Sequence, residues 1–121
     1  HYDCGGVKAA MQAKDYGLLN PWLRTIRDVY RLHQQELDAI TDADKRYRRF
    51  VEINVIEQCF NVTKMAVVQE SYLQYRTPLV HGWVFDIHSG ELIDLNIDFE
   101  DFIQKIQRIY DLTGEDWYKH Y

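Results

Sequence analysis

The segment from Leu79 to Ile87 limits most strongly which folds this chain can adopt. Its sequence, LVHGWVFDI, is rich in β-branched and aromatic residues, and both alternating sets of side chains are apolar apart from His81 and Asp86. Such a segment suits a β-strand that is covered on both faces. Ser89-Gly90 then predicts a tight turn and residues 91–97 a returning strand, so we expect a β-hairpin. One hairpin cannot supply neighbours on both sides of a buried strand, which points to a larger sheet.

The rest of the chain is predicted to be mainly helical, because apolar residues recur at intervals of three and four. The predicted helices are a short one from Val7 that ends near Tyr16-Gly17, a second opened by Asn20-Pro21, a short third at Gln34–Ala39, a long fourth from about Ala43 to Phe60, a fifth that stops before Thr77-Pro78, and a closing helix from Phe99 to Tyr110. Thr41 and Asp44 resemble a capping box for the long helix, Asn61 is expected to end it, and Thr63 to cap the next one. The residues from Gly114 onward are expected to form a polar, aromatic tail.

Several polar or amphipathic side chains interrupt these patterns. Asn54 and Gln58 lie on the apolar stripe of the long helix, and we expect a buried face whose amides bond to backbone rather than a pair of ligands. His81 is expected to bond inside the sheet and Trp83 to lie in the core. Asp3 is expected to face solvent. The other histidines have no partner visible in the sequence and are expected at the surface: His33, His88 and His120.

Composition excludes several classes of function. The 121 residues suffice for one domain with a moderate core. The 14 Lys and Arg against 19 Asp and Glu give a formal charge of −5 with no basic stripe, so nucleic acid is not expected as a partner. No apolar stretch approaches the roughly 20 residues that span a bilayer, and no signal peptide is visible. With only Cys4 and Cys59, no disulfide framework is expected, which favours a reducing compartment, the cytoplasm or an organellar matrix. The chain also opens at His1, as a mature or cut N-terminus would.

A candidate metal-binding motif stands at the start of the chain. His1 and Cys4 are three positions apart and are followed by Gly5 and Gly6. We interpret them as two ligands on a turn that opens into a helix, since zinc binds imidazole nitrogen and thiolate sulfur readily. The helix N-terminus would favour ionised Cys4, and the two glycines would let the backbone pass close to a metal. A His-x-x-Cys pair alone is a weak signal.

Three separated motifs carry a family resemblance. They are HYDCGGV at residues 1–7, EINVIEQ at 52–58 and VHGWVFDIHSGEL at 80–92. In this order they resemble the carboxy-terminal half of a β-class carbonic anhydrase. The resemblance implies an α/β fold in which helices pack on a mostly parallel β-sheet, with a C-terminal β-hairpin and a closing helix. Residues 1–121 would be the C-terminal portion of a single such domain, and the leading strands would be absent from this chain.

The resemblance also implies an activity, the reversible hydration of carbon dioxide to bicarbonate and a proton by a zinc lyase. In that family two cysteines and one histidine hold the zinc, and the H-x-x-C motif supplies the histidine and the second cysteine. These roles carry over to His1 and Cys4 as metal ligands, with Gly5 and Gly6 lining the substrate side of the site. Three protein ligands leave a fourth position for water, whose pKa the metal lowers. No other catalytic residue is assigned.

The chain departs from the family pattern in two respects. The other zinc cysteine and the aspartate–arginine pair of a C-x-D-x-R motif belong to an upstream strand that this chain lacks, and Cys59 is a poor substitute. The chain alone is therefore expected to bind zinc weakly and to be inactive. Some bacterial members bind regulatory bicarbonate through a tyrosine at the position of Phe85, so that regulation is in doubt. Members form dimers or higher oligomers, and a homodimer or tetramer is expected here.

Two other classes of function stay open. The chain could be a catalytically silent assembly module that lacks a complete metal site, which zinc-free protein with intact self-association would indicate. Alternatively, the α-amine and imidazole of His1 could chelate copper as a redox site.

Overall fold

A computed structural model describes residues 1–110 of the chain, and the expected tail from Gly114 lies outside them. The elements in chain order are α1 (Gly5–Ala10), a 3₁₀ turn η1 (Gly17–Leu19), α2 (Asn20–Leu32), α3 (Gln34–Ala39), α4 (Ala43–Thr63), α5 (Ala66–Tyr75), β1 (Trp83–Asp86), β2 (Glu91–Asp94) and α6 (Phe99–Tyr110). The predicted helices at 34–39 and 99–110 are confirmed at both ends. None of the helices among residues 1–110 is long and apolar enough to cross a bilayer.

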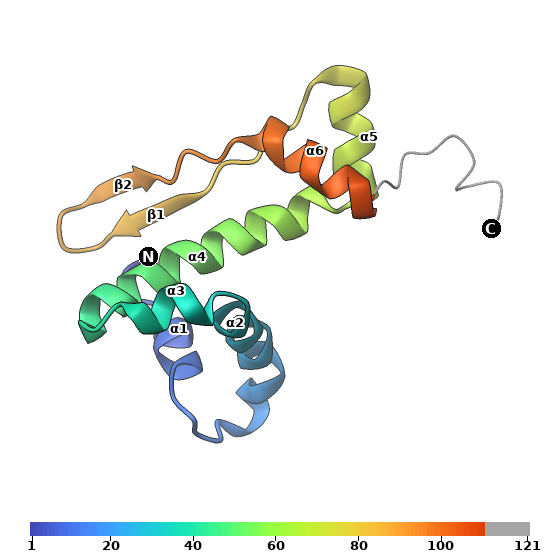
Figure 1. The fold of residues 1–121 in the computed structure, drawn as a ribbon. Helices are drawn as coiled ribbons and strands as arrows, with labels where there is room; N and C mark the ends of the chain where they lie inside the picture. Colours follow the sequence, from blue (N-terminus) through green and yellow to red (C-terminus); the bar gives the residue numbers. More distant parts are fainter. Residues whose placement is uncertain (111–121) are drawn as a thin grey trace.

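Helix α4 is the axis on which the other elements pack. It begins after Asp42, whose carboxylate accepts a hydrogen bond from the Lys45 backbone N–H at 2.9 Å, so the cap is Asp42 rather than Thr41. Figure 1 shows α1, α2 and α3 on one side of α4 and the β-hairpin on the other, with α5 and α6 at its C-terminal end. The N-terminus lies between α4 and the hairpin, where Tyr2 bonds to both Glu52 of α4 and Phe85 of β1.

Two apolar clusters hold these elements together. The larger one joins α1, α2, α3, α4 and β1, and its buried members are Tyr2, Val7, Ala10, Leu23, Ile26, Val29, Leu37, Tyr47, Phe50, Val51, Ile53 and Val84. Phe50 is fully buried in it, with its ring edge-on to Tyr30. The smaller cluster joins α5 and α6 through Val68, Tyr72, Phe99 and Ile103.

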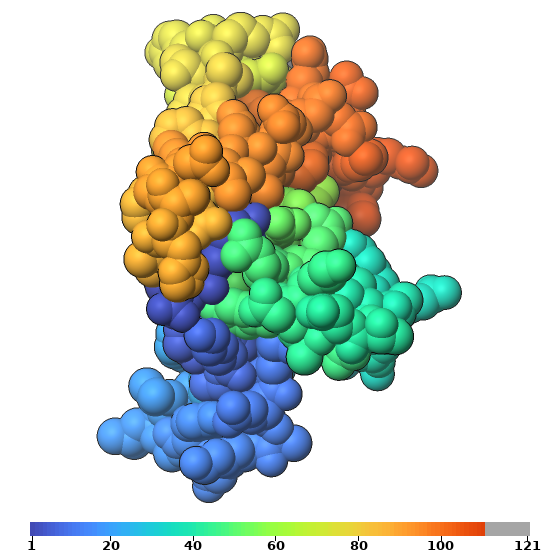
Figure 2. Space-filling model, turned by 90° about the vertical axis from the view of Figure 1, so that its left-hand side faces the viewer, coloured from blue at the N-terminus to red at the C-terminus, as the bar shows by residue number. Residues whose placement is uncertain are grey.

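Three further predictions about helix ends are wrong. Helix α1 ends at Ala10 instead of near Tyr16. The segment that follows projects from the molecule (Figure 2), and Leu18 within η1 is fully exposed. Helix α4 continues through Asn61 to Thr63. The Thr63 hydroxyl donates to the carbonyl of Cys59 at 2.8 Å, so it closes the last turn of α4 and does not cap α5.

The hairpin is covered on one face in the described residues. Strands β1 and β2 pair antiparallel, with Phe85 opposite Leu92, and Gly90 takes a positive φ of 74° in the predicted tight turn. Val84 is fully buried, whereas Trp83 and Phe85 remain 51% and 46% exposed. The expectations that both faces are covered and that Trp83 lies in the core are therefore not met. His81 is likewise exposed, with its ring stacked near that of Trp83.

Candidate functional site

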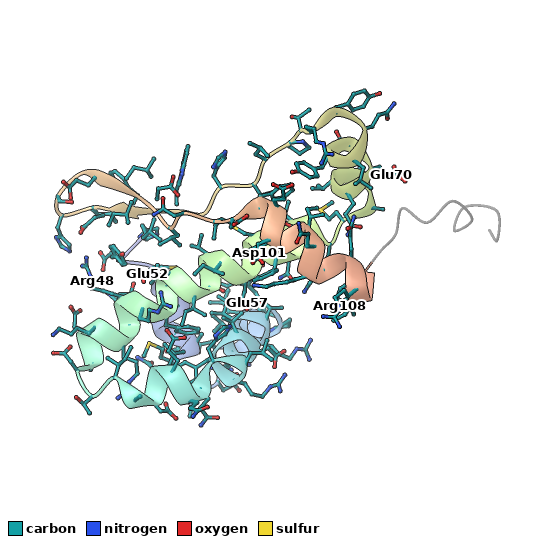
Figure 3. The ribbon with its side chains drawn as sticks, turned by 45° about the horizontal axis from the view of Figure 1, so that its top comes forward. Arg48, Glu52, Glu57, Glu70, Asp101 and Arg108 are labelled. Atoms are coloured by element: carbon teal, nitrogen blue, oxygen red, sulfur yellow. The ribbon has the colours of Figure 1, made fainter. Side chains whose placement is uncertain are left out.

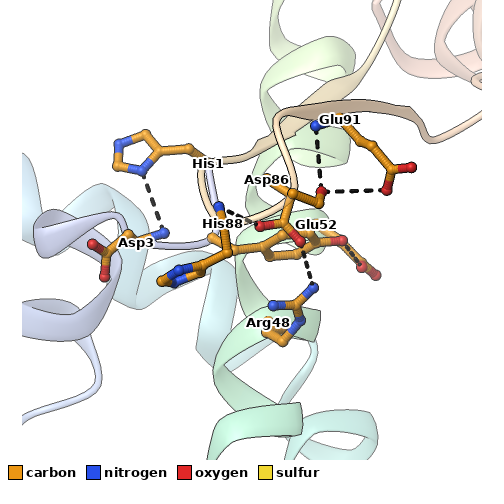
Figure 4. Close-up of polar contacts among 9 residues, drawn as sticks. His1, Asp3, Arg48, Glu52, Asp86, His88 and Glu91 are labelled. Carbon is orange, nitrogen blue, oxygen red and sulfur yellow. Dashed lines mark hydrogen bonds and ion pairs between the residues drawn. The ribbon is translucent and has the colours of Figure 1, made fainter.

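The predicted metal-binding residues lie on one tight turn. The Cys4 backbone N–H donates to the carbonyl of His1 at 3.3 Å, and Cys4 then serves as the residue before α1. A four-residue turn of this kind brings its first and last Cα atoms within about 7 Å. The His1 Nδ1 accepts a hydrogen bond from the Asp3 backbone N–H at 3.3 Å (Figure 4). Asp3 itself is exposed and pairs with Lys8 at 2.7 Å, as a solvent-facing carboxylate would.

The donors on this turn suit zinc in kind. An imidazole and a thiol are the nitrogen and sulfur ligands that zinc prefers. His1 is exposed and Cys4 is half-buried. No group of three or more His, Cys, Asp and Glu residues that could hold a metal is present among residues 1–110. The turn therefore offers two metal ligands, and residues 1–110 supply no third ligand beside them.

Cys59 does not join the turn. It is a free thiol inside α4, and its Sγ lies 3.3 Å from the position that a Cβ on Gly82 would occupy. Burial raises the pKa of the Cys59 thiol, which disfavours the thiolate that metals bind. These contacts agree with the expectation that Cys59 is a poor substitute for the family's other cysteine.

Tyr2 ties the turn to α4 and to β1. Its hydroxyl donates to Glu52 Oε1 at 2.6 Å, its ring lies under the Arg48 guanidinium at 3.9 Å, and its backbone N–H donates to the Phe85 carbonyl at 3.3 Å. Burial, and then the bond to Glu52, raise the pKa of Tyr2 to about 12. The phenol therefore stays protonated and keeps donating at neutral pH. The Tyr47 hydroxyl adds a contact by donating to the carbonyl of Cys4 at 3.3 Å.

A partly buried ion pair joins the hairpin to the same part of α4. Arg48 Nη2 lies 3.2 Å from Asp86 Oδ2, and the other oxygen of Asp86 accepts from the His88 backbone N–H at 3.0 Å. Figure 3 shows Arg48 and Glu52 on one stretch of α4, and Figure 4 shows Arg48 reaching the turn of the hairpin. The His88 amide, together with Arg48, lowers the pKa of Asp86. Asp86 is therefore a carboxylate whose charge is compensated.

The two glycines after Cys4 have different surroundings. A Cβ on Gly6 would lie 2.4 Å from Cη2 of Trp22, whereas a Cβ on Gly5 would have no atom within 4 Å. A side chain at Gly6 would therefore clash with Trp22 of α2 unless the ring moved aside. The open space beside Gly5 leaves its backbone accessible.

Two contacts differ from the sequence-based expectations, and those of Tyr2 were not predicted. His33, expected at the surface, is half-buried and lies 2.8 Å from Glu57 on α4. Gln58 is exposed, and its amide donates to Asn54 Oδ1 at 3.4 Å, so the two amides bond to each other instead of to backbone. Tyr2 carried no signal in the sequence, because its partners are about 50 and 80 positions away and no local pattern links them.

Comparisons with known proteins give the family. The family model described as carbonic anhydrase matches residues 1–92. A carbonic anhydrase of Emericella nidulans is 60% identical over 113 residues, which cover 93% of this chain and 50% of that protein. The crystal structure of a β-carbonic anhydrase from Aspergillus fumigatus is 34% identical with a TM-score of 0.76, over 88% of this chain and 51% of that one. A tetrameric β-carbonic anhydrase of Sordaria macrospora is 32% identical with a TM-score of 0.71, over 78% of this chain and 48% of that one.

The chain thus spans about half the length of the relatives it matches. The likeness to the two solved structures confirms the predicted α/β fold class, of which the described residues contain the helices and the antiparallel hairpin. The family match also spans all three motifs, from His1 to Leu92. The chain therefore belongs to the β-class carbonic anhydrase family.

Proposed function

We propose that this chain is the C-terminal portion, residues 1–121, of a single β-carbonic anhydrase domain that reversibly hydrates carbon dioxide to bicarbonate and a proton. The observation that supports the proposal is the closed backbone turn from His1 to Cys4 at the start of α1, within the region that matches the family. His1 and Cys4 would hold zinc. A bound zinc ion supplies Lewis-acid activation of water near neutral pH.

The residues of this chain orient the two donors and border the substrate. Tyr2 and Tyr47 fix the backbone of the turn against α4. Gly5 borders the substrate side, which its open Cβ position supports. Gly6 follows on the same backbone, with its rear face filled by Trp22. A third protein ligand has to come from outside the described residues, because the turn offers only two donors and Cys59 lies within α4.

The proposal extends to partners and compartment. Carbon dioxide and bicarbonate are the expected substrates, and a homodimer or tetramer is the expected assembly. The tetrameric relative from Sordaria macrospora supports self-association, as do the half-exposed aromatic rings of Trp83 and Phe85 on the outer face of the hairpin. Free thiols at Cys4 and Cys59 support a reducing compartment, the cytoplasm or an organellar matrix.

One observation favours a second candidate. Two donors leave a zinc ion largely to water, so the chain alone could serve as an assembly module without catalysis. Supplying a third zinc ligand distinguishes the two functions, because only the enzyme would then hydrate carbon dioxide.

A chimera tests the proposal. The amino-terminal half of the Emericella nidulans relative is joined to this chain, and carbon dioxide hydration is followed by stopped flow with one equivalent of zinc. We expect hydration by the chimera, loss of activity in its Cys4→Ser variant, and retained activity in the matched Cys59→Ser variant. Full activity in Cys4→Ser would overturn the proposed role of the turn. A chimera that assembles but neither binds zinc nor hydrates carbon dioxide would favour the assembly module.

A further inference from the structure

Tyr2 is the most buried residue of the metal-binding turn. Only 7% of it is exposed, although it lies between exposed His1 and half-buried Cys4. Its hydroxyl bond to Glu52 and its backbone bond to Phe85 come from opposite sides, α4 and β1. The turn is thus pinned at its second residue by two elements that are far apart in sequence.

The partners of Tyr2 are themselves fixed. The second oxygen of Glu52 lies 3.0 Å from Arg49 Nη1, and Arg49 Nε lies 2.6 Å from Glu36 of α3. Arg48, which covers the ring, is held by Asp86 of the hairpin. The acceptor and the cation that Tyr2 meets are therefore each held by a further ionic contact. A hydrogen bond to such an ionised acceptor is stronger than one between neutral groups.

Holding Tyr2 restricts His1, and separate contacts restrict Cys4. Consecutive Cα atoms are about 3.8 Å apart, so the His1 Cα stays within that distance of the held Tyr2 Cα. Cys4 is held from the other end, by its bond to the His1 carbonyl and by Tyr47. Donors that already stand in place bind a metal more tightly, because less order has to be imposed on binding.

We propose that Tyr2 is a positioning residue for the metal, which acts through its bond to Glu52 to present the His1 and Cys4 donors together. This inference rests on the proposed function, in which those two residues bind zinc. Tyr2 is not a ligand and touches no reacting atom. Its effect appears in the affinity for metal.

The test compares two tyrosines that make the same kind of bond. Tyr2→Phe keeps the ring beneath Arg48 and removes only the hydroxyl. Tyr30→Phe is the matched control, since the Tyr30 hydroxyl donates to Asp38 at 2.6 Å, between α2 and α3 and away from the turn. Zinc is titrated into isotope-labelled chain, and the His1 ring and Cys4 Cβ resonances are followed by NMR. We expect the zinc Kd to rise about tenfold or more in Tyr2→Phe and to change less than about twofold in Tyr30→Phe.

Variants of Glu52 separate positioning from charge. Glu52→Gln keeps a side-chain oxygen that can accept from the Tyr2 hydroxyl, whereas Glu52→Ala removes the acceptor. We expect Glu52→Ala to weaken zinc binding as Tyr2→Phe does, and the double variant to be no weaker than either. Glu52→Gln keeps a neutral acceptor, so we expect its zinc Kd to lie between those of the unaltered chain and Glu52→Ala. Equal weakening by Glu52→Gln and Glu52→Ala would overturn the proposal, because the charge of Glu52 would then be what matters.

Cys4→Ser distinguishes the two levels of inference. If it leaves the zinc titration unchanged, the proposed function fails and the role of Tyr2 fails with it. If Cys4 is required but Tyr2→Phe and Tyr30→Phe bind zinc equally well, only the positioning role is overturned. Urea midpoints of the two phenylalanine variants are expected to fall by similar amounts, so a difference in Kd reports on the turn and not on general stability.

Discussion

Replacing each glycine of the turn by alanine gives a sharp test of how α1 is packed. In Gly6→Ala the new Cβ would lie 2.4 Å from Trp22 Cη2 and 3.1 Å from two neighbouring ring carbons. Carbon atoms ordinarily stay about 3.5–4.0 Å apart, so the ring has to move by more than an ångström or the helix has to shift. Overpacking of this kind costs about 1–3 kcal/mol. Trp22 is 54% exposed and can swing partly aside, which favours the lower end of that range.

Gly5→Ala is the matched control, because its new Cβ meets no atom within 4 Å. Loss of glycine's freedom in the unfolded chain should raise the free energy of unfolding by about 0.4–1 kcal/mol in both variants. The two variants should therefore differ by the overpacking term alone, about 1–3 kcal/mol in favour of Gly5→Ala.

The assay is urea unfolding followed by far-UV circular dichroism. In a Trp22→Ala background the difference between the two glycine variants should vanish, because the ring that Gly6→Ala strikes is gone. Equal stability of Gly5→Ala and Gly6→Ala with Trp22 present would refute the reasoning. The contact between α1 and Trp22 of α2 would then not explain why residue 6 is a glycine.

Three further predictions concern the core, the ion pair and the thiols. Phe50→Ala should lower the free energy of unfolding by about 3–5 kcal/mol in the same urea assay, whereas Leu18→Ala, at a fully exposed position, should change it by less than about 0.5 kcal/mol. Because the folded pKa of Asp86 lies below its unfolded value, its stabilising contribution is present above that value and is lost as the pH falls. The stability difference between the unaltered chain and Asp86→Asn should therefore be constant near neutral pH and shrink below about pH 4, and a constant difference down to pH 2 would contradict this. Mass spectrometry after brief alkylation should find Cys4 modified before Cys59, whose burial raises its pKa and blocks the reagent, and the reverse order would contradict the packing of Cys59.

Local signals in the sequence were sufficient for several elements. The helices at 20–32 and 99–110 each bury one apolar stripe, and their residues recur at helical spacing over three turns, so pattern and packing agree. The hairpin turn at Ser89-Gly90 followed from turn chemistry alone. The prediction that Thr63 caps α5 is wrong because a threonine hydroxyl can also donate to a carbonyl four residues earlier in its own helix.

The parts that sequence reasoning missed depend on distant partners. His33 meets Glu57 on another helix, and Tyr2 meets Glu52 and Phe85, and no local period reports such contacts. The exposure of Trp83 differs from the expectation for a related reason. Apolar residues in both alternating sets indicate that a strand has two apolar faces. Which other segments or chains cover each face is not visible in that pattern.

Zinc K-edge X-ray absorption on this chain tests most directly the claim that the His1–Cys4 turn binds the metal. We predict one sulfur neighbour at about 2.3 Å and imidazole nitrogen at about 2.0 Å, with the remaining positions filled by oxygen. The sulfur should disappear in Cys4→Ser and persist in Cys59→Ser. A sulfur signal that survives Cys4→Ser, or that is lost in Cys59→Ser, would contradict the account.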